Sequence, residues 1–142
     1  MDNGCLFCKI IEGAIPSHKL YEDDEILAIL DIYPCHVGEA LVLPKTHYEN
    51  IFDIDRDVYI RIMDAARGFI PAMRQAAGFD GINLMQNNGE AAGAEIGHFH
   101  LHLIPRYQGD GVVKKGKRLS PSDGELKKYA EAFREAYGQG EH

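Results

Sequence analysis

The chain has 142 residues, 45% hydrophobic and 26% charged, and its 22 acidic and 15 basic residues leave a formal net charge of −7. We expect one domain over residues 1–142, because this length buries a substantial core without further support. The acidic balance argues against non-specific nucleic-acid binding, which requires a basic face. The sequence shows no basic, apolar leader and no segment suited to spanning a bilayer, which predicts a cytoplasmic protein without membrane contact.

The first half of the chain predicts a short helix followed by three strands. Residues 5–13 favour a helix that ends near Gly13. Residues 18–32 predict two strands that turn at Asp23 and Asp24, and residues 39–44 (EALVLP) predict a third strand, which Pro44 ends.

The second half adds a long helix, two strands and a last helix. Residues 55–78 carry apolar side chains at helical spacing, with acidic residues at the start and a glycine at the end. Residues 81–86 and 98–105 predict the fourth and fifth strands, and Ser122 with Glu125 forms a capping box that opens the last helix. This order predicts an α+β domain with an antiparallel sheet.

A loop between Gly109 and Pro121 gathers four basic residues. They are Lys114, Lys115, Lys117 and Arg118. A solvated run of charge is favoured here over a phosphate-contacting role.

Three histidines lie at every second position of the segment GHFHLHLIPR: His98, His100 and His102. The positions between them are apolar. Strict alternation is the period of a β-strand, so the apolar residues are expected to face a core while the three imidazoles share the other face. An imidazole is polar and titrates near neutrality, and three in register therefore favour a function over chance.

Metal binding is one function that these histidines could serve. His98 and His102 lie roughly 13 Å apart along an extended strand, too far to share one ion. Cys5 and Cys8 form a Cys-x-x-Cys chelating pair that, with one or two histidines from elsewhere, predicts a structural zinc site. The alternative is that both cysteines are small buried apolar residues.

Nucleophilic catalysis is the other function. A neutral imidazole attacks phosphorus when one ring nitrogen is held as a donor and the other keeps its lone pair. Flanking imidazoles can donate to phosphate oxygens as charge develops. This chemistry places the central residue, His100, in the position of the nucleophile.

The segment HFHLHLI resembles the signature of the histidine triad (HIT) family, His-x-His-x-His followed by apolar positions. The blocks CLFCKIIEGAIPSHKLYEDDEILAILDIYP, LVLPKTH and GINLMQNNGEAAGAEIGHFHLHLIPRY are similar to the family's successive motifs over residues 5–108. The resemblance implies a five-stranded antiparallel sheet with one long helix and shorter terminal helices, continued across a homodimer. Residues 109–142 would add a C-terminal loop and helix.

The family resemblance also implies the chemistry of the triad. It implies hydrolysis or transfer at the α-phosphate of a nucleotide, with His100 transiently nucleotidylated. His102 would contact the phosphate, and the carbonyl of His98 would orient the ring of His100.

Further positions match the family's nucleotide and zinc sites. Asp31 would bind the ribose hydroxyls of an AMP or GMP moiety. The purine would be enclosed by Phe7, Ile10 and Ile32. The phosphate and leaving group would lie near Asn87, Gly93 and Glu95. The zinc ligands would be Cys5, Cys8, His47 and His98.

Three positions depart from the family pattern. Glu39 stands where a histidine is common, Ala94 where a glutamine is frequent, and Glu95 where a hydroxyl residue often lies. A carboxylate beside a phosphate is repulsive unless it is protonated or turned away, so Glu39→Gln is expected to tighten nucleotide binding. The alternative is that Glu39 points to solvent or pairs with a lysine. His36 is expected to be an exposed loop residue.

Together these features predict a hydrolase or transferase that cleaves a purine nucleoside phosphoramidate or dinucleoside polyphosphate through His100. The alternative is a nucleotide-binding interaction protein with little or no turnover. A zinc hydrolase that uses metal-bound water is disfavoured by the separation of His98 and His102.

Overall fold

The computed structural model describes residues 4–112 and 119–139. It divides the chain into two compact units, of which the first ends at Asp110 and the second begins at Gly111. The four basic residues expected in the loop lie outside the described residues. That one domain spans residues 1–142 stays a prediction.

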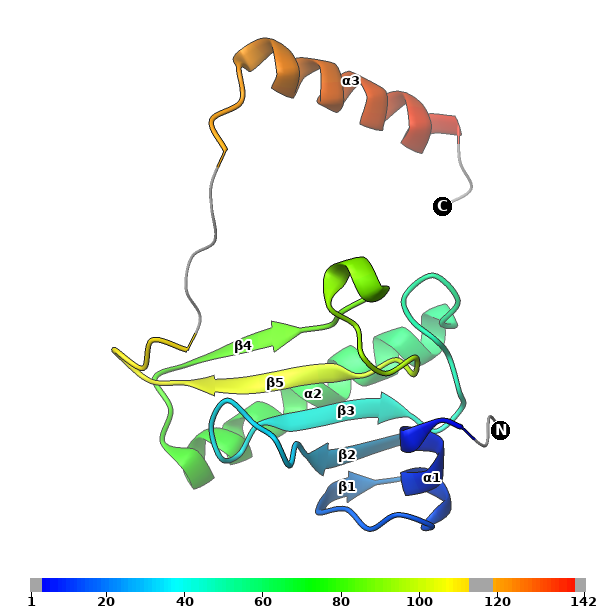
Figure 1. Ribbon diagram of the computed structural model, residues 1–142, viewed down its shortest axis with the longest axis vertical. Helices are drawn as coiled ribbons and strands as arrows, with labels where there is room; N and C mark the ends of the chain where they lie inside the picture. The colour runs from blue at the N-terminus through cyan, green and yellow to red at the C-terminus, as the bar shows by residue number, and fades with distance from the viewer. Residues whose placement is uncertain (1–3, 113–118, 140–142) are drawn as a thin grey trace. The chain divides into compact units, whose positions relative to one another are not determined.

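The first unit is built on a five-stranded sheet with the order β1-β2-β3-β5-β4 (Figure 1). The strands are β1 (Lys19–Glu22), β2 (Ile26–Leu30), β3 (Ala40–Pro44), β4 (Gly81–Met85) and β5 (Leu101–Arg106). Every neighbouring pair is antiparallel. The predicted α+β class with a five-stranded antiparallel sheet is therefore confirmed.

Two helices of this unit cover opposite faces of the sheet. Helix α2 (Arg56–Ala77) covers one face (Figure 1), where Ile62 packs with Val42 and Phe99 in one core. Helix α1 (Leu6–Glu12) covers the other, where Phe7 packs in a second core with Leu41 of β3. Alternation along the strands thus supplies side chains to both cores.

In both helices, one residue caps the first turn and one glycine ends the helix. The Cys5 Sγ accepts a hydrogen bond from the Cys8 N–H at 3.4 Å and caps α1, which Gly13 ends with φ 85°. Asp55 caps α2 in the same way, and Gly78 ends it with φ 67°. Only glycine adopts such left-handed backbone without strain.

Strand β5 differs from the expected residues 98–105. It begins at Leu101 and ends at Arg106, because the Phe99 N–H donates to the Tyr48 carbonyl at 2.7 Å rather than to a ladder partner. The alternation nevertheless holds, since Phe99 packs in the core beneath α2 while His98 reaches the opposite side.

The second unit contains α3 (Asp123–Gln139). Its first turn is capped as expected, with the Glu125 N–H donating to the Ser122 Oγ at 3.1 Å. The large apolar side chains of this helix are exposed. They are Leu126, Tyr129, Phe133 and Tyr137. Among the described residues, none of the helices is long and apolar enough to cross a membrane.

Asp23 organises the turn between β1 and β2 and joins it to α2. Its Oδ1 accepts from the N–H groups of Glu25 at 2.7 Å and Ile26 at 2.9 Å, and its Oδ2 accepts from Arg61 of α2 at 2.7 Å. The Ile26 N–H, with these other donors, lowers the pKa of Asp23 to about 2.

We expect Asp23→Ala to lower the free energy of unfolding by about 1 kcal/mol at pH 7, because the turn loses its acceptors. The pKa of Asp23 is lowered on folding, so this contribution is present above about pH 4 and is lost as the pH falls towards 2. Urea unfolding between pH 7 and 3 measures it, with the exposed Asp24→Ala as the control. An equal loss for both variants would contradict this role.

Candidate functional site

A cavity of about 470 Å³ opens on the face of the sheet that α1 covers. The nine residues expected at the nucleophile, phosphate, ribose and purine positions all line it. They are Phe7, Ile10, Asp31, Ile32, Asn87, Gly93, Glu95, His100 and His102. The fold therefore gathers residues from α1, the segment after β2, the loop before β5 and β5 itself around one cavity.

His100 has the geometry of a nucleophilic imidazole. Its Nδ1 lies 2.8 Å from the His98 carbonyl, so Nδ1–H donates and Nε2 keeps its lone pair. The edge of the Phe7 ring packs against the imidazole, with the ring centroids 4.9 Å apart. Burial lowers the pKa of His100, which favours the neutral ring. This is the carbonyl contact that the family resemblance implies.

Glu39 pairs with His102, which neither expectation for this carboxylate anticipated. The Oε2 of Glu39 lies 2.9 Å from the His102 Nδ1, and its Oε1 accepts from the Cys35 N–H at 2.9 Å. Glu39 is only 3% exposed. The interpretation that it points to solvent or pairs with a lysine is therefore wrong.

Asp31 lies beside this pair. Its Oδ1 accepts from the Tyr33 N–H at 2.9 Å, and its Oδ2 lies 4.0 Å from the His102 Nδ1. Burial raises the pKa of Asp31, and the neighbouring Glu39 carboxylate raises it further. Burial also opposes the charge of Glu39, but hydrogen bonds from Cys35, His102 and Asp31 hold its pKa below the usual range. Glu39 therefore keeps the negative charge when the two carboxyls compete for a proton.

The three expected purine positions differ in burial. Phe7 and Ile10 are buried, whereas Ile32 is 68% exposed at the rim of the cavity. His36 lies in a loop as expected, but the expectation that it is exposed is wrong. It is half-buried because its Nε2 lies 3.0 Å from the Asp110 Oδ2 and its ring packs on Tyr107.

The expected leaving-group side is formed by the loop that follows β4. Asn87 is half-buried there, and Glu95 is exposed. Between them Gly93 has φ 85°, a left-handed conformation that favours glycine. The loop thus presents backbone and two polar side chains to the same cavity.

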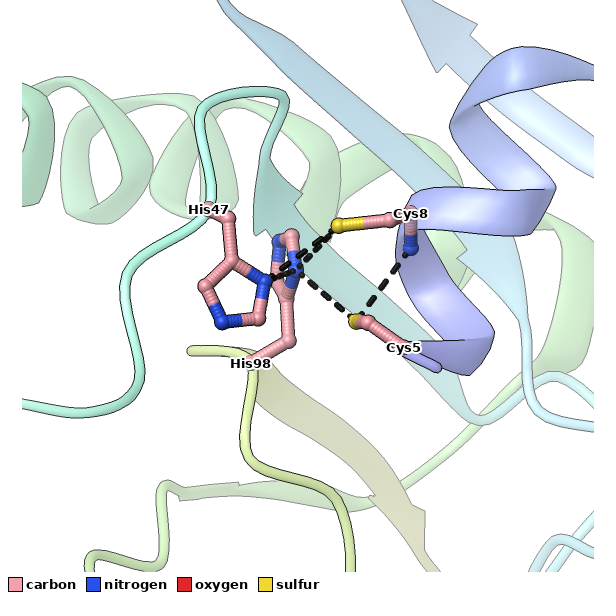
Figure 2. Close-up of side chains that lie close together, drawn as sticks. All are labelled: Cys5, Cys8, His47 and His98. Atoms are coloured by element: carbon pink, nitrogen blue, oxygen red, sulfur yellow. Dashed lines mark hydrogen bonds between the residues drawn. The ribbon is translucent and has the colours of Figure 1, made fainter. Parts of the chain in front are cut away.

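A second group of side chains forms beside the cavity. Figure 2 shows Cys5 and Cys8 of the α1 segment facing His47, from the loop after β3, and His98, from the loop before β5. One ligand atom of each lies within 4.8 Å of those of the others. The four residues that the resemblance assigns to zinc are therefore brought together from three separate segments of the chain.

The spacing in this group fits a tetrahedral metal ion. The His98 Nδ1 lies 3.1 Å from the His47 Nδ1 and 3.4 Å from the Cys5 Sγ, and the Cys8 Sγ lies 3.3 Å from the His47 Nδ1. Tetrahedral zinc separates two nitrogen ligands by about 3.4 Å and nitrogen from sulfur by about 3.6 Å. The His98 Nε2 lies 2.8 Å from the Pro44 carbonyl, to which it donates, so Nδ1 keeps its lone pair for a metal. Burial lowers the pKa of His98 to about 4, consistent with a neutral ligand.

The sequence analysis missed two features of the cavity. It did not place Cys35 and Tyr33 at the cavity wall, where both lie. It also missed the contact between Glu39 and His102, although alternation through β3 puts Glu39 on the same face as Leu41, whose partner on β5 is His102. The two-residue period of the strand was therefore the signal from which this contact could have been predicted.

Known proteins resemble both the sequence and the fold. Residues 12–109 match the model of the HIT domain. The adenosine 5′-monophosphoramidase HNT1 of Saccharomyces cerevisiae is 42% identical over 106 residues, which are 75% of this chain and 65% of the yeast protein.

Two crystal structures extend the comparison. A HIT family member from Bacillus subtilis superposes with a TM-score of 0.85 at 34% identity, covering 94% of this chain and 96% of that one. A zinc-bound histidine triad family protein from Mycobacterium smegmatis gives 0.74 at 32% identity, covering 94% and 97%. The family model covers more than half of the chain, and the relatives match it along most of its length, so the chain belongs to the HIT family.

Proposed function

We propose that the protein is a nucleotide hydrolase or transferase that acts at the α-phosphate of a purine nucleotide. The observation that carries this proposal is the His100 ring, whose Nδ1 is bound to the His98 carbonyl while the ring lines the cavity. No described buried side-chain nitrogen or oxygen lacks a partner. The His100 Nε2, for which no protein partner is described, therefore reaches solvent in the cavity.

The reaction proceeds in two displacements at phosphorus. The His100 Nε2 forms a bond to the α-phosphorus while the bond from phosphorus to the leaving nitrogen or oxygen breaks, and the leaving group takes a proton from solvent. Water then attacks the phosphorus, the phosphorus–Nε2 bond breaks, and the attacking water releases a proton to solvent. Nδ1–H stays on the His98 carbonyl throughout, so the ring is cationic only while it carries the nucleotide.

The substrate is a purine nucleoside phosphoramidate or a dinucleoside polyphosphate. Phe7 and Ile10 form an apolar wall for the base, and Asp31 offers a carboxylate to the ribose diol. The yeast relative's name supports an AMP phosphoramidate as the first compound to test.

His100→Ala is expected to abolish turnover of adenosine 5′-phosphoramidate while AMP affinity falls only a few-fold, because His100 forms a bond in the reaction and the cavity wall holds the nucleoside. Mass spectrometry of wild type quenched during turnover should find the AMP adduct on His100. The exposed His18→Ala is the control and should behave as wild type.

Multiple turnover by folded His100→Ala would exclude His100 as the nucleophile. Tight AMP binding by a wild type that shows neither adduct nor turnover would favour a nucleotide-binding interaction protein instead.

We further propose that Cys5, Cys8, His47 and His98 hold one structural zinc ion per protomer. The donor set, its spacing and the Pro44 contact that fixes His98 support this, and the Mycobacterium smegmatis relative is described as zinc-bound. Four protein ligands leave no open position for an activated water, so zinc would contribute stability rather than chemistry. His100 is not among the four residues.

Cys5→Ser should lose zinc and lower the melting temperature, while the enzyme that remains folded keeps most of its rate per molecule. Metal analysis and calorimetry measure both effects. Cys35→Ser is the matched control, because Cys35 lies outside the group and should keep one zinc per protomer. Purified protein without zinc, or a zinc-bound His100, would contradict the assignment.

We also propose a homodimer in which the sheet continues from β4 to β4 of a second copy. The sheet ends at β4 on one side and at β1 on the other. Strand β1 carries Lys19 and Glu22 and a register irregularity, which protect an edge, whereas β4 (GINLM) carries no charge and exposes Leu84.

Leu84→Glu is expected to convert the dimer to a monomer, because it places like charges across the strand pair. Sedimentation at several concentrations measures this. Leu20→Glu makes the same change at an exposed position of the β1 edge and should leave the dimer intact. Dimers that persist in Leu84→Glu and dissociate in Leu20→Glu would place the interface at β1.

A further inference from the structure

The buried contact between Glu39 and His102 determines which nitrogen of His102 carries a proton. An ionised carboxylate only accepts hydrogen bonds. The Glu39 Oε2 lies 2.9 Å from the His102 Nδ1, so Nδ1 carries a hydrogen and donates it. The second oxygen is bound to the Cys35 N–H, so the carboxylate is held at both ends. Both residues lie on the paired strands β3 and β5 or immediately beside them, which fixes their separation.

This contact also determines the state of the other ring nitrogen, Nε2. When Glu39 holds Nδ1–H and the ring carries one proton, Nε2 carries a lone pair, which repels a phosphate oxygen. Nε2 becomes a donor only when the ring carries both protons. No protein partner for this nitrogen is found among the described residues, and the ring lines the cavity beside His100.

The other charged side chains that line the cavity are acidic, so a donor at the His102 Nε2 becomes more important for binding a phosphate. Within the described part of the chain, neither lysine nor arginine lines the cavity, whereas Asp31, Glu39 and Glu95 do. Charge that develops on the phosphate oxygens during attack needs a donor aimed at them. Apart from the nucleophile, His102 is the lining side chain that can supply a positive charge there.

We propose that Glu39 is a positioning residue that acts through His102: it holds the proton on Nδ1, so that a doubly protonated His102 presents Nε2–H to the phosphate. The inference rests on the proposed function, because it assigns the phosphate to the cavity beside His102. It reverses the sequence-based expectation for Glu39→Gln. The Glu39 carboxylate holds the protonated His102 that binds the phosphate, and removing this carboxylate weakens phosphate binding.

The groups that face His102 are few. Glu39 contacts Nδ1, the Asp31 Oδ2 lies 4.0 Å from the same nitrogen, and the His100 ring centroid lies 4.9 Å away. Glu39 makes the closest of these contacts.

The experiment compares Glu39→Gln with wild type in hydrolysis of adenosine 5′-phosphoramidate. Glutamine keeps the shape but has one acceptor oxygen, so it cannot serve both the Cys35 N–H and the His102 Nδ1–H. We expect kcat/KM at pH 7 to fall on the order of 10- to 100-fold, the range for partners that orient a histidine. Glu12→Gln, which changes an exposed carboxylate on α1, should leave kcat/KM unchanged.

A double-mutant cycle tests whether Glu39 acts through His102. In a His102→Gln background, Glu39→Gln should cost less than about 2-fold, because the group it positions is gone. An undiminished cost of Glu39→Gln in that background would overturn the proposal. Glu39→Asp keeps the charge and should recover part of the rate, and melting temperatures show whether each variant is folded.

Nitrogen-15 NMR of the free protein tests the tautomer without any reaction. At high pH the neutral His102 should show a protonated Nδ1 and an unprotonated Nε2 in wild type, and Glu39→Gln should change this spectrum. A protonated Nε2 in wild type would overturn the proposal. Turnover by His100→Ala together with the expected spectrum would instead refute the proposed function alone.

A metal ion is the competing occupant of the same atoms. One ligand atom each of Asp31, Glu39 and His102 lies within 4.8 Å of the other two. Metal analysis that finds a second ion per protomer, lost in Glu39→Gln, would overturn the proposal, because an ion rather than a proton would lie on Nδ1. A single ion per protomer that Glu39→Gln retains supports it.

Discussion

His98 connects the two groups of side chains on which this molecule depends. Its imidazole lies among Cys5, Cys8 and His47, and its main-chain carbonyl accepts the Nδ1–H of His100. Whatever holds the His98 ring therefore also aims the His100 ring, and the distance between them is set by two peptide units. The rigidity of the four-residue cluster is transmitted to the His100 ring by covalent bonds, without any side chain between them.

The cavity combines this rigidity with an acidic environment. Asp31 and Glu39 lie close enough to shift each other's pKa in opposite directions, and both carboxyls lie within 4.0 Å of the His102 Nδ1. A carboxylate beside a phosphate site is unfavourable by itself, but one that is 3% exposed and bound at both oxygens interacts mainly with its partners. Whether such a carboxylate attracts or repels a phosphate therefore depends on whether a protonated imidazole is bound to the carboxylate.

The sheet follows from periods in the sequence and was predicted well, whereas His47 and His98 were assigned to the group of Cys5 and Cys8 only by the family resemblance. Alternation at His98, His100 and His102 located a strand face, and Cys-x-x-Cys located a chelating turn. The start of β5 was predicted three residues too early, because the Tyr48 carbonyl that takes the Phe99 N–H is far away in the sequence. The Asp110 partner of His36 was missed for the same reason, because a partner reached through a loop depends on the loop path, which local pattern does not contain. The contact of Glu39 with His102 was missed although strand alternation carried a signal for it.

Cys5 performs two tasks at the start of α1, since its sulfur both caps the helix and belongs to the four-residue cluster. The helix that it caps carries Phe7 and Ile10, which line the cavity. A change in the chemical state of this sulfur, such as oxidation, changes the acceptor at the first turn of a seven-residue helix, and helices this short depend on their ends. The cavity wall that Phe7 and Ile10 form is therefore coupled to the chemical state of a sulfur that does not itself line the cavity.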